Sequence, residues 1–221
     1  MEILYEDNHI IAVNKACGEI VQGDKTGDTP LSETVKEWIR NKYGKPGNVF
    51  LGVVHRLDRP VSGVVLFAKT GKALSRLNEM LRNSEIRKTY LAVVGNRPLK
   101  PDGTLVHYIV RNESQNKSFA GDTETADSKR AELCYRLTGM SDRYFLLEID
   151  LKTGRHHQIR CQLAAIGSPV RGDLKYGAPR SNADGGICLH ARRVMFVHPV
   201  SKRDILIEAP IPATWIKFRT I

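Results

Sequence analysis

Short apolar runs recur along this chain, and most have the length and β-branched composition of buried strands. The predicted strands are residues 10–15, a segment around 53, and residues 64–68, 88–94, 104–110, 133–137, 145–151, 192–197 and 204–209. Residues 139–143, of sequence GMSDR, join two segments of alternating apolar positions, which predicts an antiparallel hairpin. A second hairpin is predicted around His198-Pro199.

Three segments have the apolar spacing of amphipathic helices. The first is predicted over residues 30–42, with Thr29 as N-cap and Pro30 at the first helical position. The second is predicted over residues 72–82, and the third runs from about 156 to 166, where a glycine and then a proline end it. Many strands with a few interspersed helices predict an α+β protein built on a mixed sheet.

Residues 112–130 are almost free of apolar side chains and rich in Asn, Ser, Thr, Asp and Lys. This composition predicts an exposed and mobile loop. Elsewhere the chain has no fixed-period repeat and no long linker. A length of 221 residues therefore predicts one domain spanning 1–221.

The charge balance is basic, with 34 lysine and arginine residues against 24 aspartate and glutamate residues and a net charge of +10. A surface of this sign attracts polyanions, of which nucleic acid is the most common. Composition alone leaves RNA, DNA and an anionic membrane open. The chain contains no run of about 18 apolar residues, the length that a membrane-spanning helix needs. The acidic N-terminal segment lacks the order of a signal peptide.

The segment 55–59, of sequence HRLDR, places one carboxylate between two arginines. It lies between two predicted buried strands, and Pro60 with the following Ser-Gly predicts a turn. A loop held by core strands is a rigid mount for a functional group. Neighbouring guanidinium groups favour the ionised carboxylate. Asp58 is thus either a functional carboxylate or an aspartate that caps a turn.

Basic and hydrogen-bonding side chains also gather in residues 152–160, of sequence KTGRHHQIR, at a predicted strand-to-helix turn. Helix N-termini attract anions, so this segment predicts a site for phosphate or carboxylate. Arg160 would lie beside the core-facing side of the helix. It is therefore either a partly buried salt-bridge partner or an arginine whose stem packs along the surface.

No metal site is predicted. His156 and His157 would point roughly 100° apart, which is a poor geometry for chelation. The HRLD sequence differs from a kinase catalytic loop, because its Asp does not directly follow the Arg and Gly63 stands where the magnesium-binding Asn is expected. The four cysteines have no C-x-x-C spacing, which predicts reduced thiols in a cytoplasmic protein.

Five motifs nevertheless occur in a definite order along the chain. They are His55-Arg56-Leu57-Asp58 with Ser62-Gly63, Lys88-x-Tyr90, Gly154-Arg155-x-His157-Gln158-Ile159-Arg160, Gly172-Asp173-x-x-Tyr176-Gly177, and Leu189-His190-Ala191. From about Ile3 to Pro210 the chain resembles the RluA-type family of RNA pseudouridine synthases. The resemblance implies the catalytic fold of that family, an α+β fold with a mixed, largely antiparallel central sheet, flanking helices and an active-site cleft across the sheet. It also implies a single catalytic domain with no separate N-terminal RNA-binding module.

The resemblance further implies isomerisation of specific uridines to pseudouridine in ribosomal or transfer RNA, with no cofactor and no metal. Asp58 would be the catalytic carboxylate, acting either as a nucleophile on the sugar carbon or as a base at the neighbouring 2′ position. Arg160 would pair with Asp58. Tyr90 would stack against the base and assist removal of the proton from ring carbon 5.

A uridine inside a folded RNA must be flipped out to react. By resemblance, Arg56 would fill the space that the base vacates, and Leu189 would form an apolar wall of the base pocket. His157 and Gln158 would hold the start of the third helix. The remaining members of the substrate-binding set are His55, Arg155 and His157.

Three departures from the family pattern leave every residue expected to act in place. Ala16 stands where proline is usual, Val61 where threonine is common, and Cys161-Gln162 where the usual pair is Val-His. Two alternatives remain: a catalytically inactive RNA-binding domain of the same fold, and a hydrolytic nuclease, which would need clustered acidic residues. The expected state is a cytoplasmic monomer that binds RNA and no membrane.

Overall fold

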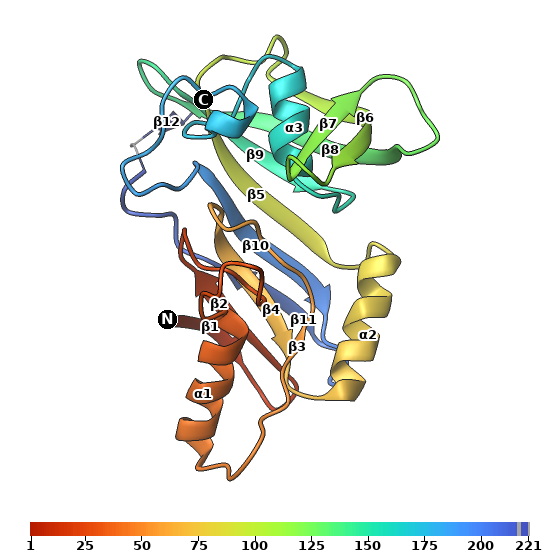
Figure 1. Ribbon diagram of the computed structural model, residues 1–221, viewed down its shortest axis with the longest axis vertical. Helices are drawn as coiled ribbons and strands as arrows, with labels where there is room; N and C mark the ends of the chain where they lie inside the picture. The colour runs from red at the N-terminus through yellow and green to blue at the C-terminus, as the bar shows by residue number, and fades with distance from the viewer. Residues whose placement is uncertain (216–217, 221) are drawn as a thin grey trace. The chain divides into compact units, whose positions relative to one another are not determined.

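The computed structural model describes residues 1–215 and 218–220, and the chain divides into two compact units. The first unit consists of Met1–Ile86 and Arg193–Pro210, and the second consists of Arg87–Arg192 and the C-terminal residues from Ile211. Each unit has its own strands and at least one helix (Figure 1).

The strands of the first unit pair in antiparallel fashion. Strand β2 (Ile10–Lys15) pairs with both β1 (Glu2–Glu6) and β4 (Ser62–Ala68), and β3 (Gly52–Val53) pairs with β4. Strand β11 (Asp204–Glu208) pairs with residues Arg193–Val197 of β10 (Leu189–Val197). The helices of this unit are α1 (Leu31–Tyr43) and α2 (Gly71–Arg82).

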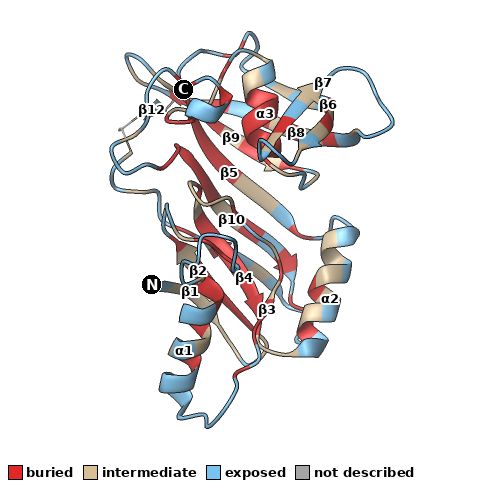
Figure 2. Ribbon diagram, in the orientation of Figure 1, coloured by how far each residue is buried: buried red, intermediate tan, exposed pale blue. Residues whose placement is uncertain are grey.

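Strands β2 and β4 are buried on both faces, which explains their continuous aliphatic sequences. Ile10, Val64 and Leu66 belong to a core cluster that also includes Ala73 and Leu77 of α2. The alternate positions on the same strands, among them Ile11, Val13, Val65 and Phe67, are also fully buried (Figure 2). Helix α2 begins where the Thr70 hydroxyl accepts the backbone N–H of Ala73.

The second unit is built on the antiparallel order β5-β9-β8-β6-β7. These strands are β5 (Arg87–Val94), β6 (Asp102–Asn112), β7 (Lys117–Gly121), β8 (Lys129–Met140) and β9 (Phe145–Leu151). The short β12 (Arg219–Thr220) pairs with β8. Helix α3 (Gln158–Ala165) packs against β6 and β7, and the 3₁₀ turn η1 (Leu174–Tyr176) follows it.

These elements confirm the predicted α+β class with few helices and a strand-rich core. Two of the four cysteines, Cys161 and Cys188, are buried. No helix in the described part of the chain is long and apolar enough to cross a membrane.

Three local predictions were wrong. Pro30, with ψ of 151°, is the N-cap of α1 rather than its first residue, because its extended backbone places its carbonyl to accept the N–H groups of Glu33 and Thr34. Helix α3 begins at Gln158, because His157 is in the left-handed region with φ of 52°. Residues 112–130 are not one loop: β6 and β7 form a hairpin there with a turn at 113–116.

Candidate active-site residues

Asp58 lies in the first unit, on a turn that a backbone hydrogen bond closes. Its backbone carbonyl accepts the N–H of Val61 at 3.0 Å, and the side chains of Leu57 and Val61 on either side of the turn are buried. Asp58 itself is half-buried. The predicted rigid mount between two strands is therefore present, with β3 and β4 supplying its two ends.

The two arginines beside Asp58 differ in their surroundings. Arg56 is exposed. Arg59 donates to the Asp28 carboxylate at 2.6 Å and to the Thr26 hydroxyl at 2.7 Å, and within the described residues it makes no hydrogen bond to Asp58. The ion-pair partners of Arg59 are therefore the carboxylates of Asp24 and Asp28.

His55 is tied to the strand that follows the Asp58 turn. Its Nε2 accepts the backbone N–H of Leu66 in β4 at 3.2 Å. This bond fixes the start of the segment that carries Arg56 and Asp58 to the core of the first unit. Sequence alone indicated the residue but not this partner.

Arg160, in the second unit, is one of the most constrained charged side chains of the protein. Its exposed fraction is 5%, and its Nε and Nη2 donate to the two carboxylate oxygens of Asp173 at 2.7 and 2.9 Å. Its guanidinium also lies 5.0 Å from the centre of the Tyr176 ring. Of the two readings of Arg160 from sequence, the buried salt-bridge partner is the correct one.

Asp173 is a residue that sequence reasoning did not assign to the site. Its exposed fraction is 1%, and its backbone carbonyl accepts the N–H groups of Tyr176 and Ala178, which shapes the turn η1. A bidentate pair fixes the plane as well as the position of a guanidinium. The Gly-Asp motif that contains Asp173 was recognisable, but its partner thirteen residues earlier was not.

His157 caps α3 in a buried position and is neutral. Its Nδ1 lies 2.9 Å from the hydroxyl of Tyr176, which accepts the backbone N–H of Ser118 at 2.8 Å. Burial, together with the nearby cations of which Arg160 is the foremost, lowers the pKa of His157 to about 2. The residue therefore carries no charge at neutral pH, and it joins α3 to the β6–β7 hairpin through Tyr176.

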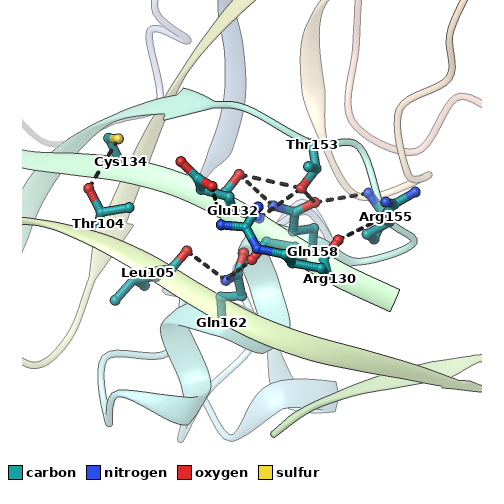
Figure 3. Close-up of polar contacts among 10 residues, drawn as sticks. Thr104, Leu105, Arg130, Glu132, Cys134, Thr153, Arg155, Gln158 and Gln162 are labelled. Carbon is teal, nitrogen blue, oxygen red and sulfur yellow. Dashed lines mark hydrogen bonds and ion pairs between the residues drawn. The ribbon is translucent and has the colours of Figure 1, made fainter. Parts of the chain in front are cut away.

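The turn before α3 is organised by one amide side chain (Figure 3). Gln158 accepts the Thr153 hydroxyl and the Arg155 backbone N–H through Oε1, at 2.8 and 2.9 Å, and donates through Nε2 to the Glu132 carbonyl. Arg155 is exposed, and its Nε donates to the carbonyl of Arg130. The predicted role of Gln158 in holding the helix start is therefore confirmed.

Tyr90 is buried on β5, where it pairs across to Ile149 of β9. Two residues earlier on the same face of the strand, Lys88 is half-buried, and burial lowers the pKa of its ammonium group. A Cβ atom built on Gly154 would lie 3.5 Å from Lys88 Nζ. Among the residues that the structure describes, Lys88 has neither a hydrogen-bond nor an ion-pair partner, and sequence reasoning did not assign it a role.

Leu189 is buried at the start of β10. The residue before it, Cys188, accepts the backbone N–H of Val93 at 2.9 Å and donates its own N–H to Arg171. These bonds place Leu189 near β5, the strand that carries Tyr90. The candidates of the second unit are thus Tyr90, Arg155, His157, Arg160 and Leu189. Those of the first unit are His55, Arg56 and Asp58.

Metal ligands do not gather anywhere in the described ranges, where no group of three or more His, Cys, Asp or Glu side chains could hold a metal ion.

Comparisons with known proteins point in one direction. Residues 9–165 match a family described as RNA pseudouridylate synthase. An uncharacterized RNA pseudouridine synthase of Bacillus subtilis, YhcT, is 34% identical over 218 residues, which cover 96% of this chain and 69% of the relative. The tRNA pseudouridine synthase C of Salmonella typhi is 32% identical over 100% of this chain and 89% of its own. The solved structure of human RNA pseudouridylate synthase domain containing 4 has a TM-score of 0.80 at 21% identity, over 96% of this chain and 89% of that one, and so shares the fold.

Proposed function

The chain belongs to the RNA pseudouridylate synthase family, whose members are isomerases, and we propose that it converts specific uridines of structured RNA into pseudouridine without a cofactor. The observation that carries the proposal is the family match over residues 9–165, which contain Asp58, Tyr90 and Arg160. The reaction breaks the bond from ribose C1′ to uracil N1 and forms one from C1′ to C5. N1 gains a proton and C5 loses one, so atoms and electrons balance without a redox partner.

Asp58 is the proposed catalytic carboxylate, either as the nucleophile at C1′ or as the base at the 2′ position. Its closed turn between two core strands supports this role, because a reacting group must be held within fractions of an ångström. Arg160, immobilised by Asp173, is proposed to stabilise the charge of Asp58 during the reaction. Tyr90 is proposed to stack on the uracil and to assist proton removal from C5.

The remaining residues are proposed to bind the flipped nucleotide. The neutral state of His157 favours a positioning role over acid–base catalysis. Leu189 is proposed as an apolar wall for the base, and His55 and Arg155 complete the set on the protein side. An inactive RNA-binding domain remains the alternative, and the presence of Asp58, Tyr90 and Arg160 in one chain weighs against it.

Transcript RNA tritiated at uracil C5 tests the proposal. Because relatives named tRNA pseudouridine synthase C match over about nine-tenths of their length, transfer RNA is the first substrate to use and ribosomal RNA the second. In the presence of a chelator, the synthase releases tritium to water and leaves the strands intact. Cleaved RNA would identify a nuclease, and binding of both RNAs without release would identify an inactive RNA-binding domain.

Arg56→Ala is expected to slow tritium release by about 10- to 100-fold without changing the melting temperature. Arg56 is exposed, so its loss costs little stability. Without its side chain the space that the flipped base leaves in the RNA stays open, and the base returns to it more readily. The measurement is single-turnover release, with Arg82→Ala as control because Arg82 is also exposed in the first unit. Full activity of Arg56→Ala would exclude it from base flipping.

Lys88→Met is expected to weaken RNA binding and to reduce by about one the slope of log affinity against log salt. A half-buried ammonium group without a partner among the described residues is suited to a phosphate oxygen. Filter binding at several salt concentrations measures both effects. The matched control is Lys72→Met, at an exposed position of α2, and an equal slope for the two variants would contradict the assignment.

A further inference from the structure

Lys15, the last residue of β2, is among the largest fully buried side chains in the described part of the chain. Its exposed fraction is zero, which is unusual for a lysine. Removing an ammonium group from water is costly unless its hydrogen bonds are replaced. The partners of Lys15 therefore indicate what this burial achieves.

All three protons of the Lys15 ammonium are donated to backbone carbonyls. The acceptors are Val61 at 2.6 Å, Arg59 at 3.0 Å and Ala16 at 3.0 Å. Arg59 and Val61 lie on either side of Pro60, immediately after Asp58. The Arg59 carbonyl also accepts the N–H of Gly18 at 2.9 Å, so the segment that follows Lys15 contacts the same turn.

The charged groups around Lys15 also include Asp58. Burial lowers the pKa of Lys15 to about 8, against the opposing influence of Glu19, Cys17 and Asp58, while Arg59 acts in the same direction as burial. The ammonium is thus charged at neutral pH and loses its charge only a little above it. The Asp58 carboxylate thus favours the charged form of Lys15.

We infer that Lys15 is a positioning residue, whose ammonium group gathers the carbonyls of the Asp58 turn and so fixes the direction of the catalytic carboxylate. The inference rests on the proposed function. A methionine of similar length would fill the same space and bury more apolar surface, so packing alone does not explain a cation at this position. Two hydrogen bonds to the carbonyls of Arg59 and Val61, which directly follow Asp58, do explain it.

Raising the pH separates this role from a merely structural one. A neutral amine donates only two hydrogen bonds, so above about pH 8 one carbonyl loses its donor and activity falls. Stability moves the other way, because the pKa of Lys15 is lower in the folded than in the unfolded chain, where it is about 10.5. Between these two values the unfolded chain binds more protons, so this residue makes folding more favourable as pH rises.

The experiment compares the pH profiles of kcat for the wild type, Lys15→Met and Lys69→Met. Lys69 is the matched control, because it is another lysine of the first unit whose side chain is only 8% exposed, but it donates to Glu6 and to the carbonyl of Asp7. The wild type should lose activity with a midpoint near pH 8. At pH 7 Lys15→Met should have a kcat lower by about 10- to 100-fold, a KM within about threefold, and no descending limb near pH 8.

Lys69→Met should keep kcat within about twofold and retain the descending limb, whatever stability it loses. Titration of the uracil itself would lower the activity of all three proteins, whereas titration of Lys15 would lower only that of the wild type and Lys69→Met. A wild-type profile that is flat through pH 8 would overturn the inference even if Lys15→Met does not fold, as would a wild-type kcat in Lys15→Met. An inactive wild-type protein would instead refute the proposed function.

Discussion

Asp58→Asn is expected to lower the rate of tritium release by at least about 10³-fold while leaving RNA affinity within about threefold. The amide has the size of the carboxylate but can act neither as a nucleophile at C1′ nor as a base at the 2′ position. The turn should persist, because the bond from Val61 to residue 58 uses the backbone carbonyl. Single-turnover release and filter binding measure the two quantities.

Asp28→Asn provides the control for this effect. Asp28 also lies in the first unit, and it accepts the Arg59 guanidinium at 2.6 Å, so the change alters charge near the same segment. Its activity should stay within a few-fold of the wild type. Turnover by Asp58→Asn within tenfold of the wild type would remove Asp58 from the chemistry.

Asp173→Asn is expected to cost about 3–5 kcal/mol in the free energy of unfolding and to lower kcat by at least about 10²-fold. The change leaves a buried guanidinium with a neutral partner that can no longer accept two charge-assisted bonds. Arg160 would then lose both its orientation and part of its stabilisation. Urea unfolding and saturating kinetics measure these losses separately.

Two further variants test whether this loss comes from the buried ion pair. Replacing both partners, as Arg160→Met with Asp173→Leu, should recover part of the stability, because neither buried charge remains, but none of the activity, because the guanidinium is lost. Glu148→Gln tests an exposed pair on the same unit, where Arg136 donates at 3.0 Å, and should change stability by less than about 1 kcal/mol. Equal effects of Asp173→Asn and Glu148→Gln would show that the buried pair has no special role.

The sequence predicted most elements because local signals were strong. The aliphatic run at residues 10–15 matches β2, and the Leu spacing of residues 72–82 matches α2 within one residue. Strand β6 was predicted as residues 104–110, but β7 was missed because it is short and lies in a polar segment, so it shows no apolar period. The packing of α3 against β7 supplies what the local sequence lacks.

For the candidate site, the sequence identified residues but not their partners. The pairing of Arg160 with Asp173 and the bonds of Lys15 to the turn at 59–61 depend on how distant segments pack. The neutral state of His157 likewise follows from burial and neighbouring cations, which spacing along a chain does not reveal. Electrostatic roles therefore required the folded chain, whereas residue identities did not.

The most direct test of the account is nucleoside analysis of a transfer RNA transcript after incubation with the protein in chelator. The account predicts that uridine at one or a few positions is replaced by an equal amount of pseudouridine, and that the Asp58→Asn protein leaves all uridine in place. Unchanged nucleoside composition in both transfer and ribosomal RNA treated with the wild-type protein would contradict it.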